Sequence, residues 1–370
     1  MTIIQLILQN LFSFIFIISL IVFIHEFGHF YVARLCGVKI EEFSIGFGKK
    51  LFGFVDKKNT QWKFCLLPFG GYVKMYGDKN AASMPDDSAI ASMSDEEKKK
   101  SFIGKNVYQR MAIVSAGPIA NFLLTIFIFT ILFKVNGLNT VLPVLDEVIA
   151  ESAAFESGLK KGDVIVAINN NEINDFEEVR NSVVTSLDGA NLLFKIKRGE
   201  EVFEVNIKPK IQIRKNFFGE DVKMATLGVA AAASSHQDLN IIQSFVRANS
   251  ETYNISISIF KALGELVTGK RDLREMGGPV KIAKYSGKTV EMGVMAVLWF
   301  MAMISVNLGV MNLLPVPVLD GGHLFYYIIE AVRGKALSLK TQQIGFRIGM
   351  SLVLSLMIFT TLNDVLQLIK

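Results

Sequence analysis

The sequence is poor in cysteine and in charge, and each shortage excludes a class of protein. With only two cysteines, Cys36 and Cys65, it cannot be a secreted scaffold held together by several disulfides. Charged residues make up 20% of the chain and hydrophobic ones 51%, which is too apolar for a typical soluble protein. The net charge of +5 is too small to indicate nucleic acid as a partner, and we expect none. A membrane protein with several spans remains.

The apolar residues gather into long runs that predict four membrane-spanning helices. A run of about 20 residues is long enough to cross the hydrocarbon core, which is roughly 30 Å thick. The runs are residues 5–24, 112–133, 292–314 and 345–362. The first could instead be a signal peptide, but no Lys or Arg precedes Arg34 and no A-x-A-like cleavage site follows. We therefore expect a retained helix and a multi-pass protein embedded in the lipid bilayer.

The distribution of basic residues between these runs predicts the orientation. The stretch before the first run has no Lys or Arg, whereas residues 36–106 carry lysines at 49–50, 57–58 and 98–100. The loop 315–344 is also basic, so the positive-inside rule places both loops in the cytoplasm. Both termini and residues 134–290 then lie outside. Cys36 and Cys65 lie near the reducing compartment, where we expect free thiols.

The large outer segment predicts a folded α+β module over residues 141–210. Short β-rich runs at 164–168, 192–196 and 202–207 surround a helix-like stretch at 174–187. Residues 156–169 resemble a PDZ domain, in which Gly158-Leu159 precedes a turn and Gly162-Asp163 opens a strand. PDZ domains bind extended peptides at a sheet edge, so a peptide C-terminus is an expected partner. The alternative is a plug or spacer without a ligand.

Two further stretches have a clear pattern. Residues 239–268 predict amphipathic helices, which could lie on the membrane surface or pack under the outer module. Residues 83–100 are rich in Ser, Asp, Glu and Lys, which is typical of a solvated cytoplasmic loop.

The motif His25-Glu26-Phe27-Gly28-His29 predicts a metal site at the end of the first apolar helix. On a helix, His25 and His29 lie on one face and can reach the same metal, and Glu26 is placed to accept a proton from metal-bound water. Ionisable residues at membrane depth are costly unless they have a partner. This cost favours a bound metal over an ordinary solvated helix turn.

A catalytic zinc takes three protein ligands and a water, so the two histidines need a third residue. His236 lies in the outer segment, on the wrong side, which leaves His323 and nearby carboxylates. We predict Asp320, because it follows the third span on the same side as the first motif. Pro315 and Pro317 break the preceding helix and could aim Asp320 at the metal, although they could also mark a simple helix end. His323 could hold a ligand in place or be an alternative ligand.

The paired motifs resemble the site-2 protease family of intramembrane zinc metalloproteases, of the bacterial regulator of sigma-E protease type. The resemblance covers essentially the whole chain through H-E-F-G-H at 25–29, N-x-x-P-x-P-x-x-D-G at 312–321 and one PDZ-like insertion. It also includes Gly46-Phe47-Gly48, residues 69–73, and residues 117–121 in the second span. It implies zinc bound by His25, His29 and Asp320, and Glu26 as general base. It further implies a substrate-binding set of Asn312, Pro315, Gly70, Gly71 and Tyr72, the last three on an edge strand.

The resemblance divides the chain into a membrane part and an inserted outer part. Residues 1–35, 107–134, 291–319 and 345–364 contain the four spans, and residues 36–106 form a cytoplasmic loop with a membrane-associated β region. Residues 141–210 form the PDZ-like domain, 211–290 an amphipathic helical region after it, and 320–344 a second cytoplasmic loop.

The expected function is hydrolysis of peptide bonds in transmembrane segments of single-pass proteins of the bacterial inner membrane. The substrate could be an anti-sigma factor already trimmed outside, or a remnant signal peptide. The best-known members of the family carry two PDZ domains, whereas this chain has room for one. This single domain would exclude untrimmed substrates by size or bind their new C-terminus. Two alternatives are a non-catalytic scaffold, against which Glu26 argues, and a metal transporter, for which the charged residues make a poor relay. Zinc suits the ligands, but iron or cobalt would accept the same set.

Overall fold

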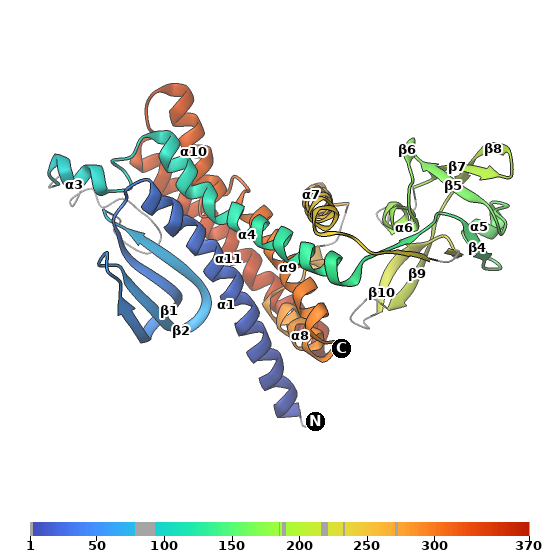
Figure 1. Cartoon of the computed structure of the whole chain (residues 1–370), viewed down its shortest axis with the longest axis horizontal. Helices are drawn as coiled ribbons and strands as arrows, with labels where there is room; N and C mark the ends of the chain where they lie inside the picture. The colour runs from blue at the N-terminus through green and yellow to red at the C-terminus, as the bar shows by residue number, and fades with distance from the viewer. Residues whose placement is uncertain are drawn as a thin grey trace. The chain divides into compact units, whose positions relative to one another are not determined.

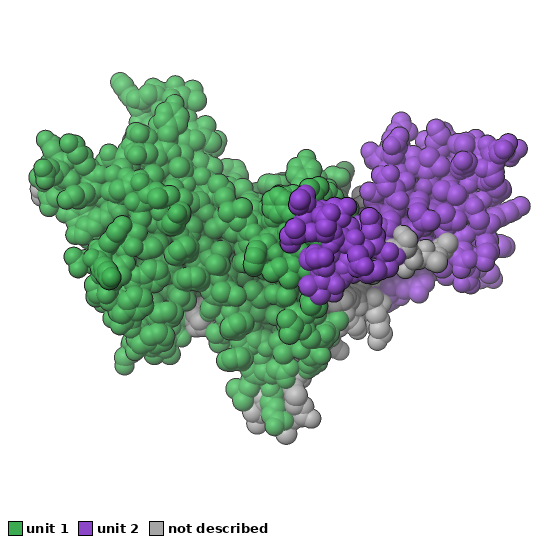
Figure 2. Space-filling model, viewed as in Figure 1, with its two compact units in different colours: residues 1–132, 244–370 green, residues 133–243 purple. Residues whose placement is uncertain are grey.

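The computed structural model describes residues 3–77, 93–184, 186, 190–215, 221–231, 234–270 and 273–369. The chain divides into two compact units, coloured green and purple in Figure 2. Unit 1 contains residues 1–132 and 244–370, and unit 2 contains residues 133–243.

Among the described residues, four helices are long and apolar enough to cross a membrane, which confirms the four predicted spans. They are α1 (Ile3–Leu35), α4 (Val107–Asn136), α9 (Val294–Asn312) and α11 (Leu339–Ile369) (Figure 1). Both α1 and α11 are longer than their apolar runs, because backbone hydrogen bonding continues through polar residues that a hydropathy pattern does not count. The motif at 25–29 therefore lies within α1, as predicted.

Four further helices belong wholly or largely to unit 1. They are α3 (Asp95–Lys100), α7 (Ile241–Val267), α8 (Pro279–Glu291) and α10 (Asp320–Arg333), with a 3-10 turn at Leu273–Glu275. A single helix, α7, covers most of the predicted amphipathic stretch. Helix α8 packs against α1, α9 and α11. The N-cap residue of α8 is Gly278, which makes no side-chain capping bond. The cap is instead Asp364 of α11, which accepts hydrogen bonds from the backbone N–H groups of Gly278 (3.0 Å) and Lys281 (2.8 Å).

The predicted loop at 83–100 needs a correction at its end. Residues 83–92 lie outside the described residues, but residues 95–100 form α3. Ser94 and Glu97 make a reciprocal capping box, and acidic residues open the helix while lysines close it. Capping and the helix dipole thus stabilise a short helix in a polar segment.

Two long antiparallel strands, β1 (Ile40–Val55) and β2 (Gln61–Met75), form the β region (Figure 1). Each strand bends back, so that Ile45 faces both Phe64 and Gly71. The pairing gives four sheet positions in the order 71–75, 40–45, 61–65 and 50–55. Gly46 and Gly48, at φ +87° and +86°, allow the bend in β1. The stretch 71–75 is thereby left as one edge of the sheet.

An aromatic cluster fixes this sheet to α1. The rings of Phe30, Phe43 and Trp62 lie with centroids 4.4–5.4 Å apart, and Phe43 is fully buried. The hairpin turn is tied to the end of α1 by an ion pair between Arg34 and Asp56. Burial would raise the pKa of Asp56, but hydrogen bonds from Thr60, Arg34 and neighbouring groups outweigh it and lower that pKa to about 2. Both cysteines are free, as predicted.

Unit 2 is an α+β module. Its largest sheet has the order β6-β5-β7-β8, and the predicted strands and helix are present. The strands of this sheet are β5 (Val164–Ile168), β6 (Asn171–Glu172), β7 (Leu192–Arg198) and β8 (Glu201–Ile207). The described part of unit 2 also contains three two-stranded sheets: β3 (Leu138–Val141) with β12 (Ser234–Gln237), β4 (Leu145–Val148) with β11 (Val229–Ala231), and β9 (Lys210–Lys215) with β10 (Asp221–Thr226). Its two short helices are α5 (Ala153–Glu156) and α6 (Phe176–Val184).

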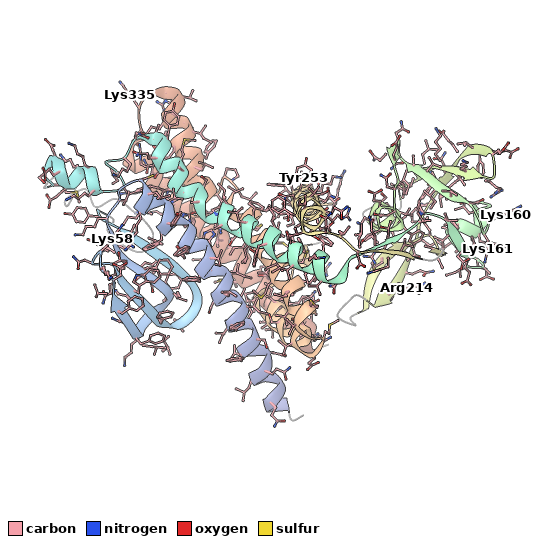
Figure 3. The ribbon with its side chains drawn as sticks, in the orientation of Figure 1. Lys58, Lys160, Lys161, Arg214, Tyr253 and Lys335 are labelled. Carbon is pink, nitrogen blue, oxygen red and sulfur yellow. The ribbon has the colours of Figure 1, made fainter. Side chains whose placement is uncertain are left out.

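The core of unit 2 is built from strand residues and α6, including the fully buried Ile165, Phe194 and Ile196. Asp163 is also fully buried. Its buried charge is compensated by Arg198, which donates to both of its carboxylate oxygens at 2.7 and 2.8 Å. Lys160 and Lys161 lie in the loop before β5 (Figure 3). The resemblance of this module to a PDZ domain stays a prediction.

Candidate metal centre

Three buried or half-buried side chains converge inside unit 1. His25 and His29 lie one turn apart on α1, each 8% exposed, and their Nε2 atoms are 3.3 Å apart. Asp320, the first residue of α10, places Oδ2 at 3.1 Å from Nε2 of His25 and 3.4 Å from Nε2 of His29. Within the described part of the chain, these three residues are the one group of His, Cys, Asp or Glu gathered closely enough to hold a metal ion.

The spacing of these three atoms fits a zinc ion. Ligands bound at about 2.0–2.1 Å in a tetrahedron lie about 3.3 Å from one another. The three observed separations are 3.1, 3.3 and 3.4 Å. Oδ2 of Asp320 is also buried and accepts no hydrogen bond within the described structure. A cation shared by the three atoms would compensate for this buried, unpartnered oxygen.

Hydrogen bonding fixes which nitrogen of His29 faces the site. Nδ1 of His29 lies 2.9 Å from the carbonyl oxygen of Ile113 on α4. Because a carbonyl only accepts, Nδ1 must carry the hydrogen, and Nε2 of the neutral ring is left with its lone pair toward Asp320. Nδ1 of His25 lies 3.1 Å from the amide nitrogen of Asn121, also on α4.

Two glycines allow α1 and α4 to approach this closely. A Cβ atom at Gly117 would lie 2.2 Å from Nε2 of His29 and 2.9 Å from Cε1 of His25. A Cβ atom at Gly28 would lie 2.3 Å from the carbonyl oxygen of Ala116. A side chain at either position would collide with the ligand rings or push the helices apart.

A tight loop places Asp320. Helix α9 ends at Asn312, and residues 313–319, which include Pro315 and Pro317, are not helical. Gly321 and Gly322 pack against this loop, since a Cβ atom at either would lie 2.3 Å from its backbone oxygens. The prolines therefore mark a break between two helices, after which α10 begins at Asp320.

The far end of α10 is held by a half-buried ion pair. Arg110, near the start of α4, lies 2.5 Å from Glu330, and its guanidinium stacks over the ring of Tyr327 at 4.8 Å. Arg110 also donates to the carbonyl oxygen of Lys105 at 3.2 Å. Since Asp320 and Glu330 share one helix, this pair helps to hold the orientation of α10.

A cavity of about 570 Å³ adjoins the three residues. Its lining includes most of the predicted site residues: His25, Glu26, His29, Gly70, Gly71, Tyr72, Asn312, Asp320 and His323. Pro315 is exposed in the loop and is not one of the residues around this cavity. His323 lines the cavity but does not belong to the group of three that converges. The predicted edge strand therefore faces the same space as the motif on α1.

Glu26 lies against this edge strand. A Cβ atom at Gly71 would be 3.0 Å from Cγ of Glu26 and 2.7 Å from the carbonyl oxygen of Ser44. Next to Gly71, the hydroxyl of Tyr72 donates to Glu42 at 2.8 Å, and Lys63 pairs with the same carboxylate at 2.6 Å. Burial, together with the bond to Glu42, raises the pKa of Tyr72 to about 12. Tyr72 is thus a fixed neutral hydrogen-bond donor at the edge.

Sequence reasoning did not assign a role to Asn121, Gly117 or the pair Arg110–Glu330. The spacing G-P-x-x-N at 117–121 was the available signal, because it puts a glycine and a buried amide one turn apart on α4. Nothing in the sequence pairs Arg110 with Glu330.

A histidine pair, a carboxylate and a neighbouring glutamate in a cavity within membrane helices define a membrane-embedded metallopeptidase. The sequence matches Peptidase family M50 over residues 13–356, and the chain belongs to this family. "Putative zinc metalloprotease Atu1380" of Agrobacterium fabrum is 41% identical over 360 residues, which cover 96% of this chain and 95% of that protein. "Putative zinc metalloprotease RC0203" of Rickettsia conorii is 40% identical, covering 97% and 99%. "Metalloprotease MmpA" of Caulobacter vibrioides is 34% identical, covering 95% and 94%.

The family resemblance predicted from the paired motifs is therefore confirmed. The protein is a zinc metalloendopeptidase of the site-2 protease type and a multi-pass membrane protein. Membership of a peptidase family also favours an enzyme over the scaffold and the transporter. Zinc, rather than iron or cobalt, is the metal in the names of these relatives.

Proposed function

We propose that this protein cleaves peptide bonds within the transmembrane segments of single-pass membrane proteins. The observation that carries the proposal is the place of the converging residues. His25 and His29 lie on a helix long and apolar enough to span the membrane, and the adjoining cavity is lined by the edge stretch of β2. A substrate held there would be cut at membrane depth.

In this proposal, His25, His29 and Asp320 hold the zinc ion through Nε2, Nε2 and Oδ2. Zinc, when bound, lowers the pKa of water toward roughly 7 and polarises a carbonyl group. Glu26 takes the proton from the attacking water and returns it to the leaving amine as the peptide C–N bond breaks. Residues of β2 and α9 hold the substrate backbone in line with these groups.

The edge at 71–75 supports a transmembrane substrate in particular. A helical segment hides its carbonyl groups in hydrogen bonds, so it must unwind before a peptide bond can be attacked. An unwound backbone in a membrane needs new partners, and a sheet edge offers N–H and C=O groups for β-augmentation. Gly71 keeps that edge free of a side chain next to Glu26, and Asn312 offers an amide at the end of α9.

For unit 2, we propose a PDZ-like role in screening substrates. It would bind the C-terminus of an externally trimmed protein or exclude untrimmed ectodomains by size. A trimmed anti-sigma factor or a remnant signal peptide would then be accepted as a substrate. This requires unit 2 and both termini to lie outside the bacterial inner membrane. The positive-inside rule supports that orientation, and Lys58 and Lys335 both lie toward the end of the bundle where α1 ends (Figure 3).

The test is cleavage of a single-pass substrate by purified protein in proteoliposomes, with the cut position read by mass spectrometry. We expect cleavage inside the apolar segment. Glu26→Gln should lower the rate at least 10³-fold and keep one zinc per chain, because Glu26 is not one of the three converging residues. Cleavage confined to a soluble flanking region, or an unchanged rate in Glu26→Gln, would overturn the proposal.

A further inference from the structure

Asn121 is a fully buried polar residue in the middle of a spanning helix, next to His25. Its amide nitrogen lies 3.1 Å from Nδ1 of His25. Its amide oxygen Oδ1 is buried and has no hydrogen-bond partner within the described structure. A buried amide oxygen without a partner is costly, and this cost is greatest at membrane depth.

Exchanging the two ends of the amide would give Oδ1 a partner in His25 and place the amide nitrogen where the oxygen now lies. The nitrogen and oxygen of an Asn side chain have nearly the same shape, so their assignment follows from the hydrogen-bond network. If Oδ1 faces His25, it accepts a hydrogen bond from Nδ1–H, and the neutral ring then has its lone pair on Nε2. If the amide nitrogen donates instead, the neutral ring carries its hydrogen on Nε2. That hydrogen would occupy the space between His25, His29 and Asp320.

We propose that Asn121 is a positioning residue, whose Oδ1 accepts the Nδ1–H of His25 and so holds this histidine in the form that binds zinc. His29 is already held in that form by the backbone oxygen of Ile113. The two ligand histidines are thus oriented by the same helix, one through a backbone carbonyl and the other through a side chain. An outer acceptor of this kind also raises the basicity of the ligand nitrogen.

The surroundings of Asn121 keep its backbone in place. Its backbone oxygen accepts hydrogen bonds from Ser305 (2.9 Å) on α9 and from Thr125 (3.0 Å) on α4. Thr125 also reaches the carbonyl oxygen of Ala302 at 3.3 Å. Gly309 of α9 packs next to this residue, since a Cβ atom there would lie 3.4 Å from Cβ of Asn121. Helix α9 therefore fixes the turn of α4 that carries Asn121.

The inference rests on the proposed ligand role of His25, and zinc affinity tests it without reference to proteolysis. In the full-length protein in detergent, competition with a chromophoric chelator would give the zinc affinity of wild type, Asn121→Asp and Asn121→Leu. Asp keeps an acceptor beside His25, whereas Leu has a similar size and no acceptor. We expect Asn121→Asp to stay within about threefold of wild type and Asn121→Leu to lose about 10–100-fold.

Thr130→Val is the matched control, because it removes a part-buried side-chain hydrogen bond, to the carbonyl oxygen of Ile126, from the same helix without touching Asn121 or His25. Its zinc affinity should stay within about threefold of wild type. Wild-type affinity in Asn121→Leu would overturn the proposal. An equal loss in Asn121→Asp and Asn121→Leu would also overturn it, provided that both variants elute as folded monodisperse protein.

A second measurement needs no variant. ¹⁵N spectra of histidine-labelled, zinc-loaded protein should show Nδ1–H and metal-bound Nε2 for both His25 and His29. A hydrogen on Nε2 of His25, or Nδ1 bound to the metal, would contradict the proposed role of Asn121. If the wild type bound no zinc at all, the ligand role of His25 would fail, which the same titration would show separately.

Discussion

Replacing Gly117 with alanine should abolish zinc binding while leaving the helix intact. The new Cβ atom would lie 2.2 Å from Nε2 and 2.6 Å from Cε1 of His29, whereas ordinary contacts begin near 3.4 Å. The imidazole must therefore move by about 1 Å, well beyond the ±0.2 Å or so that ligand distances tolerate. Alanine is also a better helix former than glycine by roughly 0.5–1 kcal/mol, so lost helicity would not explain the result.

The assay is zinc content per chain by elemental analysis of purified protein, together with circular dichroism. We expect one zinc in wild type, little or none in Gly117→Ala, and unchanged helix content. Gly264→Ala on α7 is the control, because a Cβ atom there meets nothing within 4 Å. One tightly held zinc in Gly117→Ala, with cleavage at the wild-type rate, would refute the close approach of α4 to the histidines.

Three other perturbations have definite expected outcomes. Gly71→Ala should lower the cleavage rate at least tenfold with zinc retained, because the methyl group meets Glu26 and the edge backbone; loss of zinc would contradict this. Asp364→Ala should lower the free energy of unfolding by about 1 kcal/mol, since it removes the cap of α8, and Tm in detergent checks it. Burial opposes ionisation of Asp163, but Arg198 and the backbone N–H of Lys160 hold its pKa below the usual value. Its folded pKa is thus below its unfolded pKa, so the ion pair stabilises unit 2 above about pH 4 and loses this effect as pH falls. Asp163→Asn should cost about 2 kcal/mol at pH 7, and its difference from wild type in denaturant midpoint should shrink toward pH 3.

The spans and the converging residues could be predicted because their signals are local or strongly constrained. Long apolar runs mark spans, and a helix period places His25 and His29 on one face. Asp320 followed from the topology, which returns the third span to the same side of the membrane. Burying charge in a membrane is costly, so few ionisable residues occur at membrane depth. Those that do occur there, such as His25, His29 and Asp320, are therefore strong candidates for a shared site.

The rest depends on contacts between segments that a sequence pattern does not pair. Span two is apolar on all faces, so neither Gly117 nor Asn121 shows which neighbour it meets. The bend that lets Ile45 face both Phe64 and Gly71 depends on register within a sheet, which alternation alone does not specify. Composition alone predicts a loop at 83–100, although Ser94 and Glu97 carry the capping signal for α3.

The distance along the chain between the parts of the metal centre has a consequence for biosynthesis. His25 and His29 leave the ribosome early, but Asp320 follows roughly 290 residues later, after unit 2 and the third span. A nascent chain therefore carries two of the proposed ligands without the third during most of its synthesis. With the proposed ligand set, hydrolytic activity can begin only when the loop 313–319 and α10 have been synthesised, so the order of synthesis itself would delay the activity of the protease until the membrane part is nearly complete.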